Sequence, residues 1–278
     1  MTPLTLTAPA KLNLSLRVLG QRDDGFHDID TLMVKLPGLA DTLEFTPAED
    51  FAFTCDDAGL PGGDDNLVVK AARAFAAAAG VKPRCRIHLA KRIPAAAGLG
   101  GGSSDAATTL LGLNRLHDEA LPPARLREVA AALGSDVPFF LGEGAARCTG
   151  RGEVVTPVAE PPALDLLLLK PEFGVDTASA YARCLSARPL PGISYDPQEL
   201  DGLTLVNDLE RAVFRKFLIL AEIKQWLLSR AEVAAALLCG SGSTVFAVLK
   251  DAASAPTLIT ASRQELDPKL WVWSGSSK

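Results

Sequence analysis

A glycine-rich stretch, residues 94–105, contains the clearest pattern for ligand binding. Four of its glycines fall within five residues, and two serines and an aspartate follow. Residues 106–114 then have the apolar spacing of a helix. Glycine lets a ligand approach the main chain closely, and a helix start offers unpaired N–H groups and the positive end of its dipole. The stretch therefore predicts a site for phosphate or another anion. The alternative is a flexible loop in which Ser103 or Ser104 caps the helix.

Two common nucleotide loops do not fit this stretch. It lacks the Gly-Lys-Ser/Thr ending of the usual P-loop. Counted from Gly98 and Gly100, the third position of Gly-x-Gly-x-x-Gly is Ser103, so the dinucleotide fingerprint fails as well.

Three further polar residues could take part in chemistry. Residues 11–18 alternate with period two, which predicts a half-buried strand with Lys11 and Asn13 on one face. Asp136 stands between a Gly-Ser turn and an aromatic-rich segment, a setting suited to a proton-accepting base. The alternatives are a solvated strand face for the first two residues and an N-cap of a short 138–141 turn for Asp136.

Two weaker signals lie elsewhere. Phe26 and His27 stand together where a polar turn enters a strand, which is weak evidence for a binding site. A partly buried structural histidine is the commoner explanation of such a pair. A second glycine-rich turn spans residues 239–244, and Gly-Ser-Gly is also an ordinary tight connection.

Composition narrows the protein class. The 278 residues are 48% hydrophobic and 22% charged, as in globular proteins, and a net charge of −5 argues against a nucleic-acid partner. Five scattered cysteines and three histidines disfavour a disulfide framework and a zinc site. With no signal peptide and no long apolar run, we expect a cytoplasmic protein without a membrane partner.

Predicted strands and helices, which must position these residues, are interspersed along the chain. We expect an edge strand over 5–8, interrupted by Pro9-Ala10, and a helix over 67–79 that follows a cap at residues 64–66. Segments 41–46 and 51–55 read as a hairpin or edge pair. Strands are predicted at 29–36, 84–90, 144–149, 153–158, 164–170, 245–249 and 270–273, and helices at 123–133, 177–185, 217–229 and 256–265. The best domain boundary by composition is residues 159–162.

Three motifs in a fixed order carry a family resemblance. Residues 9–14, the stretch 94–105 and the turn 240–244 together resemble the GHMP kinase superfamily of galacto-, homoserine, mevalonate and phosphomevalonate kinases. Residues 24–27, 134–140 and 207–210 resemble the branch whose acceptor is a cytidine diphosphate conjugate of methylerythritol, in the non-mevalonate route to isoprenoids. The resemblance covers essentially the whole chain.

The resemblance implies a fold and an activity. The fold would be α+β with two domains, a ribosomal-protein-like N-terminal domain over 1–158 and a ferredoxin-like C-terminal domain over 159–278, with a substrate cleft between them. The activity would be ATP- and Mg²⁺-dependent phosphorylation of a hydroxyl on the methylerythritol part of a small-molecule substrate. Ser103, Ser104 and Asp105 are candidates for the metal or its water shell, while the metal ligands and the oligomeric state stay open.

The resemblance also implies residue roles. Asp136 would accept the hydroxyl proton and Lys11 would hold Asp136 in place. The ATP-binding residues would be Asn66, Lys91, Pro94, Gly98, Leu99, Gly100, Gly101, Gly102, Ser103 and Ser104, the first two near the nucleoside. The substrate-binding residues would be Asn13, Phe26, His27, Tyr181, Gly240, Ser241 and Gly242, with Phe26, His27 and Tyr181 around the cytosine.

One residue departs from the family pattern, and two other functions compete. The family usually has tyrosine at the position of Phe26, so the ring is kept and any hydrogen bond from its hydroxyl is lost. Another kinase of the superfamily, acting on a mevalonate-type acid, would favour arginine or lysine within residues 24–27. A non-catalytic nucleotide-binding protein on the same scaffold would be free to lose Lys11 or Asp136, and both are present.

Overall fold

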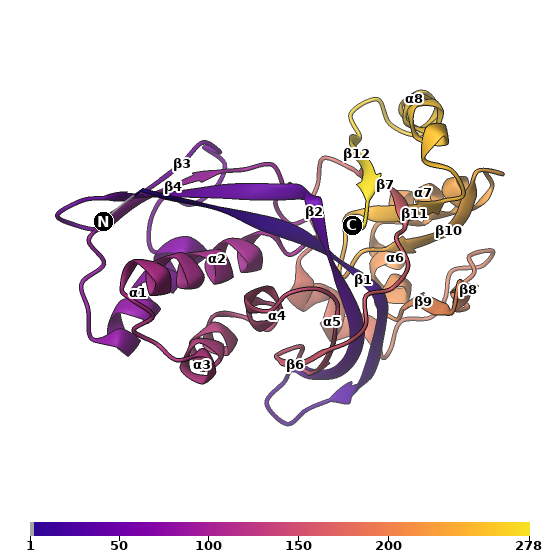
Figure 1. The fold of residues 1–278 in the computed structure, drawn as a ribbon. Helices are drawn as coiled ribbons and strands as arrows, with labels where there is room; N and C mark the ends of the chain where they lie inside the picture. The colour runs from indigo at the N-terminus through magenta and orange to yellow at the C-terminus, as the bar shows by residue number, and fades with distance from the viewer. Residues whose placement is uncertain (1–2) are drawn as a thin grey trace.

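Two β-sheets frame the molecule in the computed structural model, which describes residues 3–278 (Figure 1). Within these residues the larger sheet has eight strands, ordered β3-β4-β2-β1-β9-β8, with β5 added on β2 and β6 on β5. Its strands are β1 (Leu4–Gln21), β2 (His27–Pro47), β3 (Ala52–Cys55), β4 (Cys85–Ala90), β5 (Ala146–Gly150), β6 (Val154–Pro157), β8 (Gln198–Leu200) and β9 (Leu203–Asn207). The smaller sheet has the order β10-β11-β7-β12. Its strands are β7 (Asp165–Lys170), β10 (Val233–Leu238), β11 (Val245–Leu249) and β12 (Trp271–Ser276).

Helices cover these sheets, which confirms the predicted α+β class. In Figure 1, α1, α2 and α3 lie on one side of the larger sheet. The helices are α1 (Leu67–Ala79), α2 (Gly101–Leu116), α3 (Pro123–Leu133), α4 (Val137–Leu141), α5 (Thr177–Cys184), α6 (Glu210–Lys216), α7 (Leu218–Leu228) and α8 (Ala255–Glu265), with a short 3₁₀ turn at Ala252–Ser254. Along the described part of the chain, each helix falls short of the length and apolarity that crossing a bilayer requires.

The long antiparallel pair β1–β2 corrects the expected interruption of the first strand. Pro9 and Ala10 do not end it, because β1 stays paired with β2 on both sides of them. Proline cannot donate to the ladder, and the pairing register shifts between these two residues, so the defect is absorbed as an irregularity within one strand. A second register shift lies between Asn13 and Ser15, beside the cleft described below.

Two strand pairings differ from the expectations. Segment 51–55 does not pair with segment 41–46, because β4 lies between them and pairs with β3 in parallel. Strand β9 was not predicted, and it pairs in parallel with β1 through Ser15 opposite Val206. Both errors concern partners that are distant in the chain, which local alternation does not specify.

The starts of three helices show which polar side chains are used as caps and which are not. Helix α1 begins after Asn66, whose Oδ1 accepts from the Val68 N–H, as the predicted cap requires. Helix α2 follows Gly100, and no side chain caps it, so the alternative in which Ser103 or Ser104 is the cap is wrong. Asp136 precedes α4 without a capping hydrogen bond, which leaves its carboxylate available.

A shared apolar core joins the two sheets. Leu12 and Leu14 of β1 pack in one buried cluster with Leu166 and Leu168 of β7 and Phe246 of β11. Burying each such side chain contributes roughly 1.5–3 kcal/mol. Strand β1 therefore supports both halves of the molecule, while the domain boundary at residues 159–162 stays a prediction.

Candidate active site

A cleft of about 920 Å³ gathers most of the residues singled out in the sequence. The predicted site residues that line it are Lys11, Asn13, Phe26, His27, Asn66, Lys91, Pro94, Gly98, Leu99, Gly100, Gly101, Gly102, Ser103, Asp136, Tyr181, Gly240 and Ser241. Two predicted residues lie outside this lining. Ser104 is fully buried in α2, and Gly242 donates its N–H to the Cys239 carbonyl within the second turn.

Lys11 and Asp136 meet in this cleft although they are far apart in the chain. The Lys11 Nζ lies 3.6 Å from the Asp136 Oδ2, and it donates to the Asn13 Oδ1 at 2.6 Å. Lys11 is buried, whereas the Asp136 side chain is 34% exposed and open to a ligand. A carboxylate near an ammonium stays ionised and can accept a proton.

Backbone contacts hold the glycine loop against β1 and the second turn. The Lys11 N–H donates to the Leu99 carbonyl at 2.9 Å, and the Thr244 N–H donates to the Ala97 carbonyl at 3.2 Å. Gly98 has a φ of +78°, and a Cβ added there would lie 2.1 Å from the Cys239 carbonyl oxygen. Only glycine fits between these two backbones.

The start of α2 faces the cleft, where the sequence predicts an anion site. The helix begins at Gly101 with no side chain over its first N–H groups, and Gly101, Gly102 and Ser103 line the cleft. Unpaired N–H groups and the helix dipole together favour a negatively charged ligand at this position.

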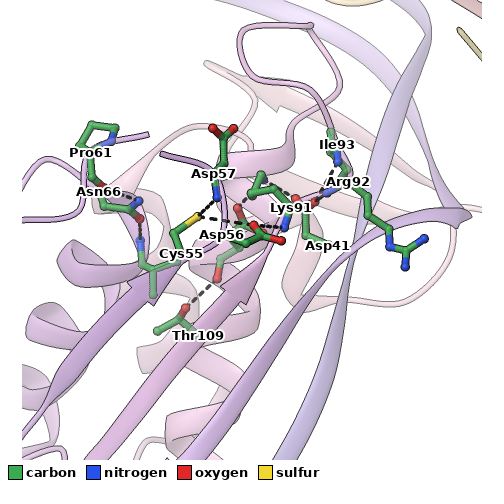
Figure 2. Close-up of polar contacts among 12 residues, drawn as sticks. Asp41, Cys55, Asp56, Asp57, Pro61, Asn66, Lys91, Arg92, Ile93 and Thr109 are labelled. Atoms are coloured by element: carbon green, nitrogen blue, oxygen red, sulfur yellow. Dashed lines mark hydrogen bonds and ion pairs between the residues drawn. The ribbon is translucent and has the colours of Figure 1, made fainter. Parts of the chain in front are cut away.

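Lys91 is held by two carboxylates under the loop, a cluster that sequence reasoning missed. Its Nζ donates to Asp41 and, at 2.8 Å, to the Asp105 Oδ2, while the Asp41 Oδ1 accepts from the Arg92 and Ile93 N–H groups (Figure 2). Burial alone would lower the pKa of Lys91, but the carboxylates of Asp105 and Asp41 raise it above its ordinary value. The Lys91 charge is therefore balanced inside the protein.

Asp105 is the less well stabilised of the two carboxylates in this cluster. Burial raises the pKa of Asp105 to about 7 against the attraction of Lys91, and nearby Asp41 raises it further. Its Oδ1 is buried without a hydrogen-bond partner. One lysine thus neutralises two carboxylates, and the only sequence signal was an aspartate at the first residue of the strand segment 41–46.

Asn66 also uses its side chain internally. Besides capping α1, its Nδ2 donates to the Pro61 carbonyl at 2.9 Å (Figure 2). Asn66 and Lys91 therefore shape the wall of this end of the cleft with groups already bonded to the protein.

Three rings and one arginine also line the cleft. The rings of His27 and Tyr181 lie 5.5 Å apart with a tilt of 36°, and burial raises the pKa of the Tyr181 phenol, which stays neutral. The guanidinium of Arg151 lies 4.5 Å from the Phe26 ring centroid. Arg151 was missed, although a basic residue between two glycines in a strand connection offered a signal.

The second glycine turn is fixed by an asparagine that sequence reasoning did not single out for the site. The Asn207 Nδ2 donates to the carbonyls of Leu238 at 2.8 Å and Gly240 at 2.7 Å. Ser241 shares a 2.9 Å hydroxyl contact with Thr177 at the start of α5. The turn therefore joins β9, β10 and α5 at the edge of the cleft.

One carboxylate near the glycine loop has an oxygen suited to a divalent cation. Among residues 3–278 no group of three or more His, Cys, Asp or Glu side chains is arranged to hold a metal. Mg²⁺, however, commonly uses one or two carboxylates together with substrate phosphates and water. The unpartnered Oδ1 of Asp105, in the cleft lining beside Ser103, meets that requirement.

Comparisons with known proteins agree with this geometry. Residues 66–144 match the N-terminal domain of the GHMP kinases and residues 196–267 match their C-terminal domain. The 4-diphosphocytidyl-2-C-methyl-D-erythritol kinase of Methylacidiphilum infernorum is 42% identical, with coverage of 95% of this chain and 93% of the relative. The enzyme of the same name from Pelotomaculum thermopropionicum is 41% identical, with coverage of 91% of both chains.

Solved structures extend the comparison to the fold. A crystal structure of a 4-(cytidine 5'-diphospho)-2C-methyl-D-erythritol kinase superposes with a TM-score of 0.78 at 34% identity and covers 98% of each chain. Homoserine kinase from Cytophaga hutchinsonii shares the fold, with a TM-score of 0.71 at 16% identity over 100% of this chain and 95% of that one. The chain therefore belongs to the GHMP kinases, which are ATP-dependent phosphotransferases, and within them to the family of 4-diphosphocytidyl-2-C-methyl-D-erythritol kinases.

Proposed function

We propose that this kinase transfers the γ-phosphoryl group of ATP to a hydroxyl on the methylerythritol part of 4-diphosphocytidyl-2-C-methyl-D-erythritol. Relatives with that name align over nearly the whole chain. The observation that carries the proposal is the position of the Lys11–Asp136 pair in the cleft. The glycine loop and the rings of Phe26, His27 and Tyr181 line the same cleft.

The glycine loop and the start of α2 bind the ATP phosphates. Half a charge at a helix N-terminus, about 4 Å from a phosphate charge at an effective dielectric near 20, contributes roughly 2 kcal/mol. The surface carboxylates responsible for the net charge of −5 oppose this only weakly, because those beyond about 10 Å are largely screened. Asp105 and Ser103 would hold Mg²⁺, which when bound neutralises phosphate charge.

Asp136 acts as the general base. The acceptor O–H bond breaks and its proton passes to the Asp136 carboxylate, while the oxygen forms a bond to the γ-phosphorus. The bond from that phosphorus to the β–γ bridging oxygen breaks, and ADP leaves with the electron pair. Phosphoryl transfer depends mainly on positioning and charge stabilisation, which this cleft provides on both sides of the reacting atoms.

Lys11 serves two purposes in this scheme. Its ammonium holds Asp136 in place through their ion pair, and it compensates negative charge that develops on the phosphoryl oxygens during transfer. Its main chain also anchors the loop, because the Lys11 N–H donates to the Leu99 carbonyl. Charge and nucleotide position are thereby linked through one residue.

The aromatic end selects the acceptor. Phe26 supplies a flat apolar face, and the His27 imidazole can hydrogen-bond a base edge beside Tyr181. A mevalonate-type acid would favour arginine or lysine within residues 24–27, where this chain has Phe26 and His27. The test is a coupled ADP-release assay over a panel containing the cytidine conjugate, mevalonate and homoserine. We expect release with the conjugate, and release with mevalonate instead would overturn the acceptor assignment.

The base is tested separately with Asp136→Asn, which we expect to lower kcat by roughly 10²-fold or more with little change in the KM for ATP. The matched control is Asp30→Asn, because Asp30 is also a partly exposed carboxylate in an ion pair, with Arg147, and lies outside the cleft lining. Wild-type turnover by Asp136→Asn would remove this residue from the mechanism.

A further inference from the structure

A buried row of hydrogen bonds runs from the cleft into the larger sheet. Lys11 Nζ donates to Asn13 Oδ1 at 2.6 Å, Asn13 Nδ2 donates to Thr31 Oγ1 at 2.8 Å, and Thr31 Oγ1 donates to the Ser15 carbonyl at 2.6 Å. All three side chains are buried, and Thr31 is fully so. Thr31 lies on β2 outside the cleft lining.

The direction of every proton in this row follows from its two ends. An ammonium only donates, so the amide of Asn13 must turn its oxygen toward Lys11 and its NH₂ toward Thr31. A backbone carbonyl only accepts, so the Thr31 hydroxyl must send its proton to Ser15 and accept from Asn13. The ammonium therefore sets which way the Asn13 amide faces, and the Thr31 hydroxyl anchors its NH₂ end.

The row holds the ammonium at a set distance from the base. Asn13 draws the Lys11 Nζ to 2.6 Å, while the nearest Asp136 oxygen is 3.6 Å from that nitrogen, beyond direct hydrogen-bond contact. Direct contact with an ammonium favours the ionised form of a carboxyl group and makes it a weaker proton acceptor. At the longer distance both Asp136 carboxylate oxygens stay free of a hydrogen bond from Lys11 and can accept one from a substrate hydroxyl.

We infer that Thr31 is a positioning residue for phosphoryl transfer, which through Asn13 holds the Lys11 ammonium back from Asp136. The inference rests on the proposed role of Asp136 as the base. The row is not a proton wire, since the Lys11 ammonium at its cleft end has no lone pair to accept a proton from the substrate. Without the Thr31 hydroxyl the NH₂ group of Asn13 loses its hydrogen-bond partner, the amide is no longer anchored to β2, and the ammonium moves into contact with Asp136.

The test compares Thr31→Val, which keeps the shape and removes the hydroxyl, with Thr31→Ser, which keeps the hydroxyl. We expect Thr31→Val to lower kcat about 10-fold with the KM for ATP changed less than about 2-fold, as loss of transition-state positioning requires. The acid limb of its kcat–pH profile moves down by about half a unit, because the base is weakened. Thr31→Ser restores kcat to within about 3-fold of wild type.

Thr109→Val is the matched control, because Thr109 is equally buried and its hydroxyl bonds only the Asp105 carbonyl within α2. It should leave the pH profile in place. If Thr31→Val does not fold, Thr31→Ala takes its place in the comparison with Thr31→Ser. A wild-type kcat and pH profile in the hydroxyl-free variant, or equal losses in the serine and valine variants, overturns the inference.

A measurement without turnover separates this inference from the proposed function. In the unliganded protein, NMR should show slow solvent exchange of the Asn13 side-chain NH₂ protons, and faster exchange in Thr31→Val. Equal exchange in both proteins overturns the row of hydrogen bonds, whatever acceptor the kinase uses. Rates relative to wild type are then compared on whichever member of the acceptor panel releases ADP.

Discussion

Gly98→Ala should separate the two glycine turns and slow the kinase. The new Cβ would lie 2.1 Å from the Cys239 carbonyl oxygen. That oxygen is a backbone atom and the Cβ is fixed to the backbone of the loop, so one of the two turns must move by about 1 Å to restore ordinary contact. A misplacement of about 1 Å at a reacting centre can cost on the order of 10²-fold in rate. The positive φ of +78° adds about 1 kcal/mol of strain or more.

Gly80→Ala separates the clash from the backbone strain. Gly80 ends α1 with a φ of +66°, and a Cβ there would meet nothing within 4 Å. We expect both variants to lose about 1 kcal/mol of unfolding free energy from strain, but only Gly98→Ala to lose kcat/KM for ATP by roughly 10²-fold. Urea unfolding and the coupled ADP assay measure the two quantities. A Gly98→Ala enzyme with wild-type kcat and KM for ATP would refute the fit between the two turns.

Three further outcomes follow from named contacts. Lys224→Met strips the counterion from Glu210, whose pKa burial already raises, and should cost about 3–5 kcal/mol in urea unfolding, with recovery when Glu210→Gln is added. The pKa of Asp105 is raised to about 7 in the folded state, so its neutral form is favoured by folding. This contribution to stability is complete below about pH 4 and is lost as pH rises through 7. Relative to Asp105→Asn, the wild type should therefore lose unfolding free energy between pH 5 and 8, and parallel curves would contradict the shift. Phe26→Ala should raise the KM for the cytidine conjugate more than that for ATP, whereas equal changes would contradict the acceptor end.

Local chemistry in the sequence was enough to predict the motifs and most elements. The Asn66 cap and the Gly80 end of α1 follow from side-chain and backbone preferences within a few residues. The α2 start was placed a few residues late, because glycines at its first turn mask the helical pattern. The structure has the helix begin at Gly101, inside the anion loop itself.

Contacts between distant segments could not be predicted from spacing. Nothing local says that Asp41 bonds Lys91, or that β9 joins β1, because register depends on the partner strand. The Lys11–Asp136 pair was expected only through the family resemblance, and the structure gives it a distance. Thr31 could not be predicted as a site residue, because it is an ordinary strand residue in the sequence. Its proposed role comes from the hydrogen bond that it accepts from Asn13.

The backbone ties of the glycine loop have a consequence for the entropy of nucleotide binding. Glycine-rich chain loses the most conformational freedom when it is ordered, about 1–2 kcal/mol per residue or more. Here Ala96, Ala97 and Leu99 already accept hydrogen bonds from Val175, Thr244 and Lys11. The loop is therefore ordered when the chain folds, and ATP meets a preorganised cradle whose ordering cost was met in folding rather than in binding.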